Sequence, residues 1–233
     1  LLSGTPTPES YSQMYHQVCG IRNNPFRKFN NFYAFAKTYV DVRQRKINGN
    51  YINDYSKGLQ SIIDMMKPYT ISYTQKEAGF KVQTNEEILY VDVPSDLRNI
   101  IKRLSTDRVI EGKDQVVLAD TAVKLMSKTH QLYSGTVKFE SGKSMVLDLT
   151  KAKFIQSMFK NKKIAIFYKF TAEYEAIKDV FGESICNTLE EFCNTDKSIA
   201  LQIVSGREGI SLKQAVALVY YNIDFSATSY WQS

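Results

Sequence analysis

The last third of the chain alternates short apolar runs with stretches of helical periodicity. The run at 163–168 is apolar throughout its centre, which is typical of a strand covered on both faces, and the runs at 199–204 and 215–221 predict two more buried strands. Helices are expected between these strands, with Thr150 and Thr171 as their N-caps. Strands that alternate with helices in this way predict an α/β fold with a parallel sheet.

The earlier part of the chain predicts mainly helices. Tyr11, Met14, Tyr15 and Val18 recur at the spacing of one helical face, so a helix should start at residue 9 or 10. The other predicted elements are helices at 59–66, 97–104 and 118–131, a strand at 88–93, and a hairpin formed by 136–140 and 144–149.

Residues 23–54 are rich in both aromatic and basic side chains, among them Phe26, Phe35, Tyr39, Arg43 and Lys46. We interpret this stretch as a helical subdomain whose aromatic rings pack a core. The alternative is a surface where aromatic and basic groups bind nucleic acid.

Composition narrows the class of protein. Of the 233 residues, 43% are hydrophobic and 23% are charged, a balance that argues against a disordered chain. The net charge of +6 mildly favours binding to polyanionic partners. The sequence has no apolar run long enough to span a membrane, no secretory signal, and only three cysteines. We therefore expect a reduced, cytoplasmic protein with no membrane partner. Both ends lie inside structured-looking sequence, so we also expect a fragment of a longer chain.

Two possible sites can be set aside on spacing. The tripeptide at 142–144 reads Gly-Lys-Ser, as in a phosphate-binding loop. Such a loop also needs a glycine at position 137, which is valine here, so we interpret the tripeptide as a hairpin turn. The cysteines and histidines lack the paired spacing of a zinc site, so no metal site is expected. They are Cys19, Cys186, Cys193, His16 and His130.

The loop at 205–210 is a stronger candidate. It follows a buried strand, where α/β sheets bind their ligands, and its two glycines allow close approach of the backbone. Arg207 and Glu208 add a cation and an acceptor beside it.

Three stretches occur in a specific order: LLSGTPTPE at 1–9, IAIFYKFTAEYEAI at 164–177, and LQIVSGREGISLKQAVALVYYNIDFSATSYWQ at 201–232. They resemble motif three, motif four, and motif five with the approach to motif six of the helicase-like ATPases in the Swi/Snf branch of superfamily two. With its many tyrosines, this sequence is more similar to the phage members of the family than to the chromatin remodellers. A phage origin would place the protein in the cytoplasm of a bacterial host.

This resemblance implies part of a two-lobed motor that hydrolyses ATP, with Mg²⁺, to move on nucleic acid, most simply double-stranded DNA. Residues 1–68 would be the end of the first RecA-like lobe with a helical insertion. Residues 69–233 would be most of the second lobe, a parallel sheet flanked by helices.

The resemblance also assigns roles to individual residues. Residues implied to couple nucleotide state to lobe closure are Ser3, Gly4 and Thr5. Residues implied to face the cleft and the nucleotide are Ser205, Gly206, Glu208, Gly209 and Gln232. Residues implied to contact nucleic acid are Thr150, Lys151, Lys153, Tyr168 and Lys169, of which Lys151 and Lys153 could equally be plain surface lysines.

The sequence lacks a phosphate-binding loop, a D-E-x-[HD] box and the arginines of motif six. We therefore expect ATP and Mg²⁺ to bind only in a full-length protein, and this chain alone to be inactive. One alternative is a non-catalytic nucleic-acid-binding or docking module with the same fold. Another is an unrelated α/β enzyme whose loop at 205–210 holds a phosphorylated small molecule.

Overall fold

The computed structural model describes residues 6–7, 9–47, 49–73, 77, 79, 85–206, 210–223 and 225–226. The chain divides into two compact units, Leu1–Glu87 and Ile88–Ser233, called here the first and second unit. The predicted assignment of 1–68 and 69–233 to two motor lobes stays a prediction.

Short helices form the body of the first unit. They are the 3-10 helix η1 (Tyr11–Gln13), α1 (Met14–Val18), α2 (Phe32–Tyr39), α3 (Ser61–Met66) and the 3-10 helix η2 (Lys67–Tyr69). Asn31 is the N-cap of α2, because its side-chain oxygen accepts a hydrogen bond from the Ala34 N–H at 2.9 Å. The helices predicted near residues 9–18 and 59–66 are therefore present, the first of them partly as a 3-10 turn.

Aromatic rings make up much of the core between these helices. Phe26 and Phe35 are almost completely buried, with ring centroids 5.0 Å apart in an edge-to-face arrangement. Tyr15 lies 4.9 Å from Phe35 and donates its hydroxyl proton to the Phe29 carbonyl. For these rings, the interpretation as a packed core is confirmed.

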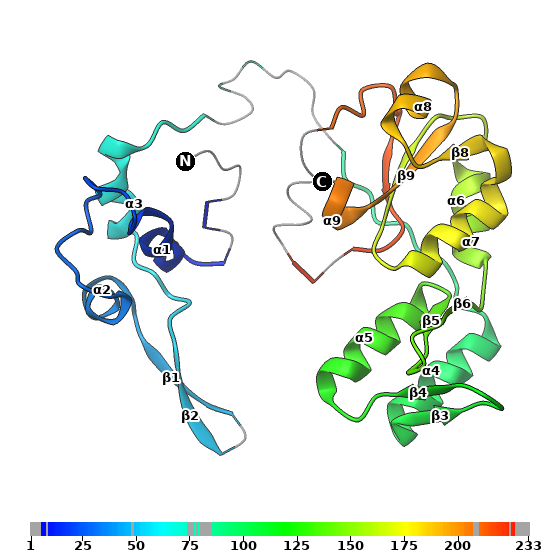
Figure 1. The fold of residues 1–233 in the computed structure, drawn as a ribbon, viewed down its shortest axis with the longest axis horizontal. Helices are drawn as coiled ribbons and strands as arrows, with labels where there is room; N and C mark the ends of the chain where they lie inside the picture. Colours follow the sequence, from blue (N-terminus) through cyan, green and yellow to red (C-terminus); the bar gives the residue numbers. More distant parts are fainter. Residues whose placement is uncertain are drawn as a thin grey trace. The chain divides into compact units, whose positions relative to one another are not determined.

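The first unit also contains a hairpin that we did not predict. It joins β1 (Arg43–Ile47) to β2 (Asn50–Asp54), and Figure 1 shows it as a ribbon extending away from the helices of the first unit. The stretch at 23–54 is therefore only partly helical.

The second unit begins with a helical pair that carries two small hairpins. Its elements are α4 (Ser95–Asp107), β3 (Val109–Glu111), β4 (Val116–Leu118), α5 (Ala122–Tyr133), β5 (Thr136–Lys138) and β6 (Ser144–Val146). The predicted strand at 88–93 is wrong: these residues are not in a strand and pair with no described residue, and Ile88 and Tyr90 are exposed. A β-type sequence forms a strand only where a partner satisfies its backbone.

A four-stranded parallel sheet forms the rest of the second unit. Its strands are β7 (Ala165–Tyr168), β8 (Ile185–Cys186), β9 (Ser198–Gln202) and β10 (Leu218–Tyr220), in the order β10-β7-β9-β8. Its helices are α6 (Thr150–Met158), α7 (Thr171–Phe181), the 3-10 helix η3 (Gly182–Ser184), α8 (Leu189–Asn194) and the short α9 (Ile203–Gly206) (Figure 1). The predicted α/β class, with a parallel sheet flanked by helices, is confirmed.

Alternate side chains of β7 explain why the sheet is covered on both faces. Ile166 packs with residues of α6 and α7, whereas its neighbour Ala165 packs with Phe192 of α8 on the opposite face. This is the arrangement that a continuous apolar run indicates.

The predicted threonine caps are wrong in detail. Thr150 and Thr171 are the first helical residues of α6 and α7, one position too late to be N-caps. Carboxylates satisfy the free backbone donors instead: Asp148 accepts from the Thr150 N–H at 2.9 Å, and Glu173 accepts from the Phe170 N–H at 2.9 Å.

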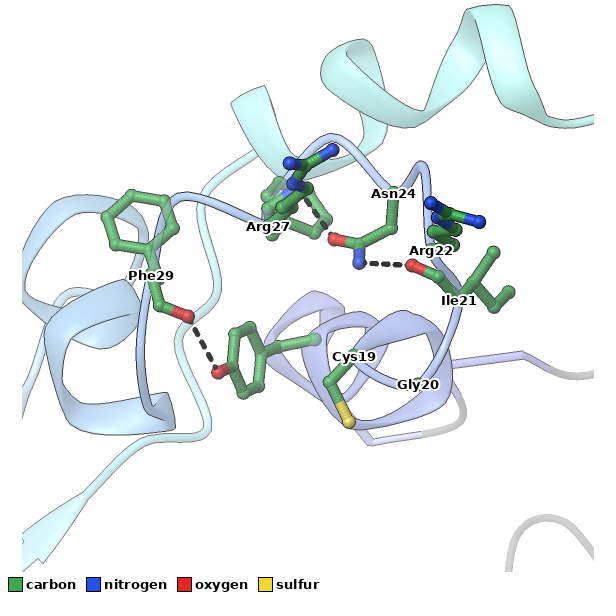
Figure 2. Close-up of a pocket in the computed structure, with 9 residues that line it drawn as sticks. Cys19, Gly20, Ile21, Arg22, Asn24, Arg27 and Phe29 are labelled. Atoms are coloured by element: carbon green, nitrogen blue, oxygen red, sulfur yellow. Dashed lines mark hydrogen bonds between the residues drawn. The ribbon is translucent and has the colours of Figure 1, made fainter.

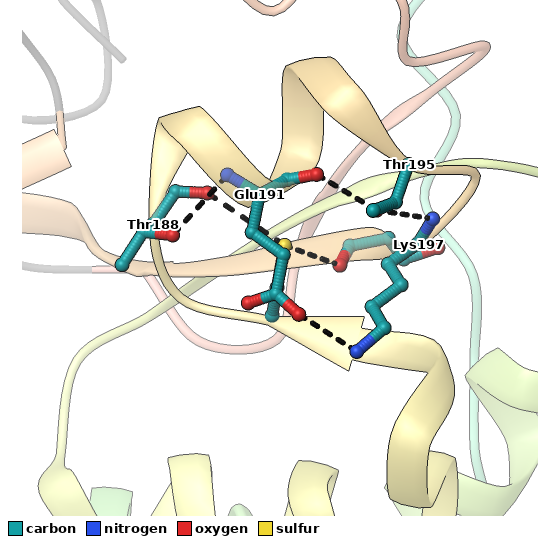
Figure 3. A network of polar contacts seen from close by, with 6 residues as sticks. Thr188, Glu191, Thr195 and Lys197 are labelled. Carbon is teal, nitrogen blue, oxygen red and sulfur yellow. Dashed lines mark hydrogen bonds and ion pairs between the residues drawn. The ribbon is translucent and has the colours of Figure 1, made fainter.

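A polar network fixes α8 against the sheet (Figure 3). Thr188 caps the helix by accepting from the Glu191 N–H at 3.3 Å, and Thr195 donates its hydroxyl proton to the Glu191 carbonyl at 2.7 Å. Lys197 binds the Glu191 carboxylate at 2.7 Å, and this hydrogen bond raises the pKa of Lys197.

No helix in the described part of the chain is long and apolar enough to cross a membrane. Among the same residues, no three His, Cys, Asp or Glu side chains are grouped so as to hold a metal ion.

Candidate functional site

Polar side chains of the second unit gather where the parallel strands end. Tyr168 is the last residue of β7 and Lys169 follows it, Gln202 is the last residue of β9, and Asn222 lies two residues beyond β10. Because the strands are parallel, these positions share one edge of the sheet, the edge at which α/β proteins bind ligands. We call this the carboxyl edge.

Glu173, in the first turn of α7, is the centre of the hydrogen bonding at this edge. It is completely buried, and its carboxylate accepts hydrogen bonds from the backbone N–H groups of Lys169 at 2.8 Å and Phe170 at 2.9 Å. Its other oxygen accepts from the side-chain amide of Asn222 at 2.6 Å. One carboxylate therefore joins the segment after β7 to the segment after β10.

Lys151, in the first turn of α6, lies beside this network. Its ammonium group is 5.2 Å from the ring centroid of Tyr221, which is a cation–π contact. The negative charge of Glu173 favours the protonated form of Lys151. Burial nevertheless lowers the pKa of Lys151. Tyr221 is completely buried, donates its hydroxyl proton to the Ser134 carbonyl at 3.2 Å, and has its own pKa raised by burial.

Lys169 lies on the same edge between two aromatic rings. Its ammonium group is 4.4 Å from the ring centroid of Phe225 and 5.3 Å from that of Phe170. Its carbonyl accepts a hydrogen bond from the Gln202 side chain at 3.1 Å, which ties the end of β7 to the end of β9. Two lysines therefore stand on this edge, and its buried carboxylate is already occupied by three donors.

His130 of α5 extends the edge into a shallow pocket. Its ring lies 4.6 Å from Phe225 and 5.6 Å from Phe170, and its buried Nδ1 makes no hydrogen bond to any described residue. Burial lowers the pKa of His130, which favours the neutral form of the ring. The pocket beside it, about 490 Å³ in volume, is lined mainly by α5 and by Phe225.

The structure brings together four of the five residues predicted to contact nucleic acid. Thr150 and Lys151 begin α6, Tyr168 ends β7, and Lys169 follows it directly. The Thr150 hydroxyl is already used, because it donates to Asp148 at 3.0 Å. Burial raises the pKa of Tyr168, whose ring lies 5.6 Å from that of Tyr174.

Lys153, the fifth of these residues, lies further along α6 and is exposed to solvent. Lys151, by contrast, is half-buried and in contact with Tyr221, so it is not a plain surface lysine.

The candidates implied to face a nucleotide are mostly beyond what the structure describes. Ser3, Gly4, Thr5, Glu208, Gly209 and Gln232 lie outside the described residues. Ser205 and Gly206 end α9, the short helix that follows β9, so their backbone lies in the segment that leaves the carboxyl edge.

The sequence reasoning missed Glu173, Asn222, His130 and Gln202. Glu173 carried a usable signal, because a glutamate in the first turn of a helix, three residues after the cap, commonly accepts backbone N–H bonds from the preceding segment. Asn222 had no local signal, since its partner is 49 residues away in the sequence.

A second pocket, in the first unit, is shaped by backbone contacts (Figure 2). Asn24 donates to the Ile21 carbonyl at 2.7 Å and accepts from the Phe26 N–H at 2.9 Å, which fixes the loop around about 270 Å³ of open space. Arg22 and Arg27 line it with exposed side chains. The hydrogen bonds hold the loop itself, so this pocket is the weaker candidate.

The carboxyl edge can hold an anion better than it can perform acid–base chemistry. Among the described residues it offers ammonium groups, an amide and an imidazole whose pKa is lowered by burial, and the buried carboxylate of Glu173 already accepts three hydrogen bonds. Comparison of the sequence with models of known protein families and with curated protein sequences finds no match.

Proposed function

We propose that the chain is the C-terminal portion of an ATP-dependent nucleic-acid translocase, a helicase-like ATPase of the Swi/Snf type. In this proposal residues 69–233 are the second RecA-like lobe, and residues 1–68 end the first lobe. The observation that carries the proposal is the lysine-bearing carboxyl edge. Two of its segments, after β7 and after β10, belong to the stretches that resemble the family's motif four and its motif five with the approach to motif six.

Physical logic supports a nucleic-acid backbone as the ligand of this edge. A motor that moves along a strand has to hold phosphates without reading bases, and lysines and backbone amides provide contacts of that kind. Glu173 contributes indirectly, because it holds the two segments in register while Lys151 and Lys169 carry the positive charge.

ATP and Mg²⁺ belong, in this proposal, to the full-length protein. The phosphate-binding loop and the acidic box would come from the first lobe, and motif six would complete the cleft. The partners are then double-stranded DNA and the first lobe of the same polypeptide.

The test is ATP hydrolysis by the full-length protein with and without DNA. We expect DNA to stimulate hydrolysis, and Lys153→Ala to raise the DNA concentration needed for half-maximal stimulation with little effect on the maximal rate. Losing one phosphate contact should also reduce the salt dependence of duplex binding by about 0.9 in the slope of log K against log salt concentration. Lys162→Ala removes an exposed lysine beyond the other end of α6 and is the matched control.

Two results would count against the proposal. If DNA does not stimulate hydrolysis but binds with steep salt dependence, the chain is a non-catalytic nucleic-acid-binding module. If neither hydrolysis nor DNA binding is found, the α/β enzyme that binds a phosphorylated small molecule becomes the better account.

A further inference from the structure

The β1–β2 hairpin of the first unit has no packing role that would explain its sequence. The side chains of Arg43, Gln44, Arg45 and Lys46 in β1, and of Tyr51, Ile52 and Asn53 in β2, are all exposed. A two-stranded hairpin is only marginally stable by itself, so one that is exposed on both faces gains little from burial. Its exposed side chains are therefore accessible to a binding partner.

The pairing register divides these side chains between two faces. Arg45 lies opposite Ile52 on one face, and on the other face Gln44 lies opposite Asn53 and Lys46 opposite Tyr51. The contacts agree with this assignment, because Gln44 donates to Asn53 at 3.4 Å and the Lys46 ammonium group is 5.8 Å from the Tyr51 ring centroid.

Cations on the first face are neutralised. Arg43 forms an ion pair with Asp41 at 2.8 Å, and Arg45 forms one with Asp54 at 2.6 Å. Hydrogen bonds from Ser56 lower the pKa of Asp54, so its carboxylate stays charged beside Arg45.

The second face keeps its charge. In the part of the chain that the structure describes, Lys46 has no ion pair, and its contact is the open side of an aromatic ring. Tyr51 is 69% exposed, which leaves most of that ring available to another molecule. Asn53 donates to the Tyr55 hydroxyl at 3.2 Å, so the amides beside the ring are held in place. An exposed ring, a lysine without an ion pair to any described residue, and ordered amides thus share one face of the hairpin. Figure 1 shows the hairpin extending from the helices of the first unit.

We propose that this face of the hairpin, formed by Gln44, Lys46, Tyr51 and Asn53, binds single-stranded nucleic acid. The Tyr51 ring stacks on a base, and Lys46 contacts the adjoining phosphate. Aromatic stacking accepts any base, and a nearby cation adds affinity for the backbone, which is the combination used by proteins that bind single strands without sequence preference. The inference deepens the proposed function, because it gives the motor a contact to unpaired nucleotides outside the second unit.

The test is fluorescence anisotropy of a labelled oligothymidine titrated with the 233-residue chain at several salt concentrations. We expect Tyr51→Ala to weaken binding about 5- to 150-fold, the range for loss of one stacked base, and Tyr51→Phe to restore it. Lys46→Ala should reduce the slope of log K against log salt concentration by about 0.7.

Controls are available in the same unit. Tyr69 is 60% exposed, so Tyr69→Ala removes a similarly exposed ring, but one whose neighbouring lysine, Lys67, is already ion-paired with Asp64 at 2.8 Å. Lys37→Ala removes one exposed charge from α2. Neither should change binding, and circular dichroism should show that every variant keeps the wild-type fold.

Failure of this inference can be told apart from failure of the proposed function. If the oligonucleotide binds but Tyr51→Ala matches Tyr69→Ala, or if only duplex DNA binds, the hairpin inference is wrong and the motor proposal is untouched. If the chain binds no single strand, the inference is again wrong, and DNA-stimulated hydrolysis by the full-length protein decides the proposed function separately.

Discussion

Replacing Glu173 should disrupt the carboxyl edge more than any other single change there. The side chain is completely buried and accepts three hydrogen bonds, from the N–H groups of Lys169 and Phe170 and from the amide of Asn222. Glu173→Ala leaves these three donors without their acceptor, and each buried unpaired group costs about 1–3 kcal/mol. It also removes the negative charge that favours the half-buried ammonium group of Lys151.

Some of these groups will recover water, so we expect a loss of about 3–5 kcal/mol in the free energy of unfolding. That is a large share of the roughly 5–15 kcal/mol typical of a folded domain. Glu173→Gln should cost less, because the amide oxygen can still accept the two backbone bonds while Asn222 turns its own amide to match.

Urea denaturation followed by circular dichroism measures the change, with hydrogen–deuterium exchange at Lys169 and Phe170 as the local readout. Glu175→Ala is the matched control, because Glu175 lies on the same helix and is exposed. The control should change the free energy of unfolding by less than about 0.5 kcal/mol. If Glu173→Ala is equally mild, then Glu173 does not organise this edge and the account of the site is wrong.

Three further predictions test other parts of the structure. Burial lowers the pKa of His130 in the folded state, so its contribution to stability is complete above about pH 6.5 and is lost as the pH falls below that value. Melting temperatures measured as a function of pH should show a smaller loss between about pH 5 and 7 in His130→Phe, and an unchanged pH profile would contradict this prediction. Iodoacetamide should modify the exposed Cys19 and Cys193 in the native chain but not Cys186, which is buried with its pKa raised, and mass spectrometry showing early labelling of Cys186 would refute its burial. Phe35→Ala should cost the first unit about 3–5 kcal/mol in denaturant unfolding, against little for Tyr33→Ala, which removes a ring that is 65% exposed; equal effects would argue against the aromatic core.

The sequence predicted the structure correctly where a local pattern of residue types suits only one environment. The apolar run at 163–168 predicted β7 because a strand covered on both faces has to be apolar on both, and Gly182 ends α7 with a positive φ that favours glycine. The 88–93 run misled because β-type residues do not reveal whether a partner strand is within reach.

The rest of the site depends on contacts that no local pattern shows. Glu173 and Asn222 meet only because β10 pairs with β7, a neighbour relation that the order of elements in the sequence does not determine. The β1–β2 hairpin was missed because most residues of its strands are polar and its few apolar ones do not alternate with them, although Asn48-Gly49 is a common sequence signal for a tight hairpin turn.

The proposed function requires a nucleic-acid backbone along the carboxyl edge of the parallel sheet. The most direct test is to map amide chemical-shift changes in the 233-residue chain while a short DNA duplex is added at low salt. We expect the amides of Lys151, Lys153, Lys169 and Phe170 to shift together, and these changes to disappear as salt is raised. Shifts confined to the opposite edge of the sheet, or changes that persist at high salt, would contradict it.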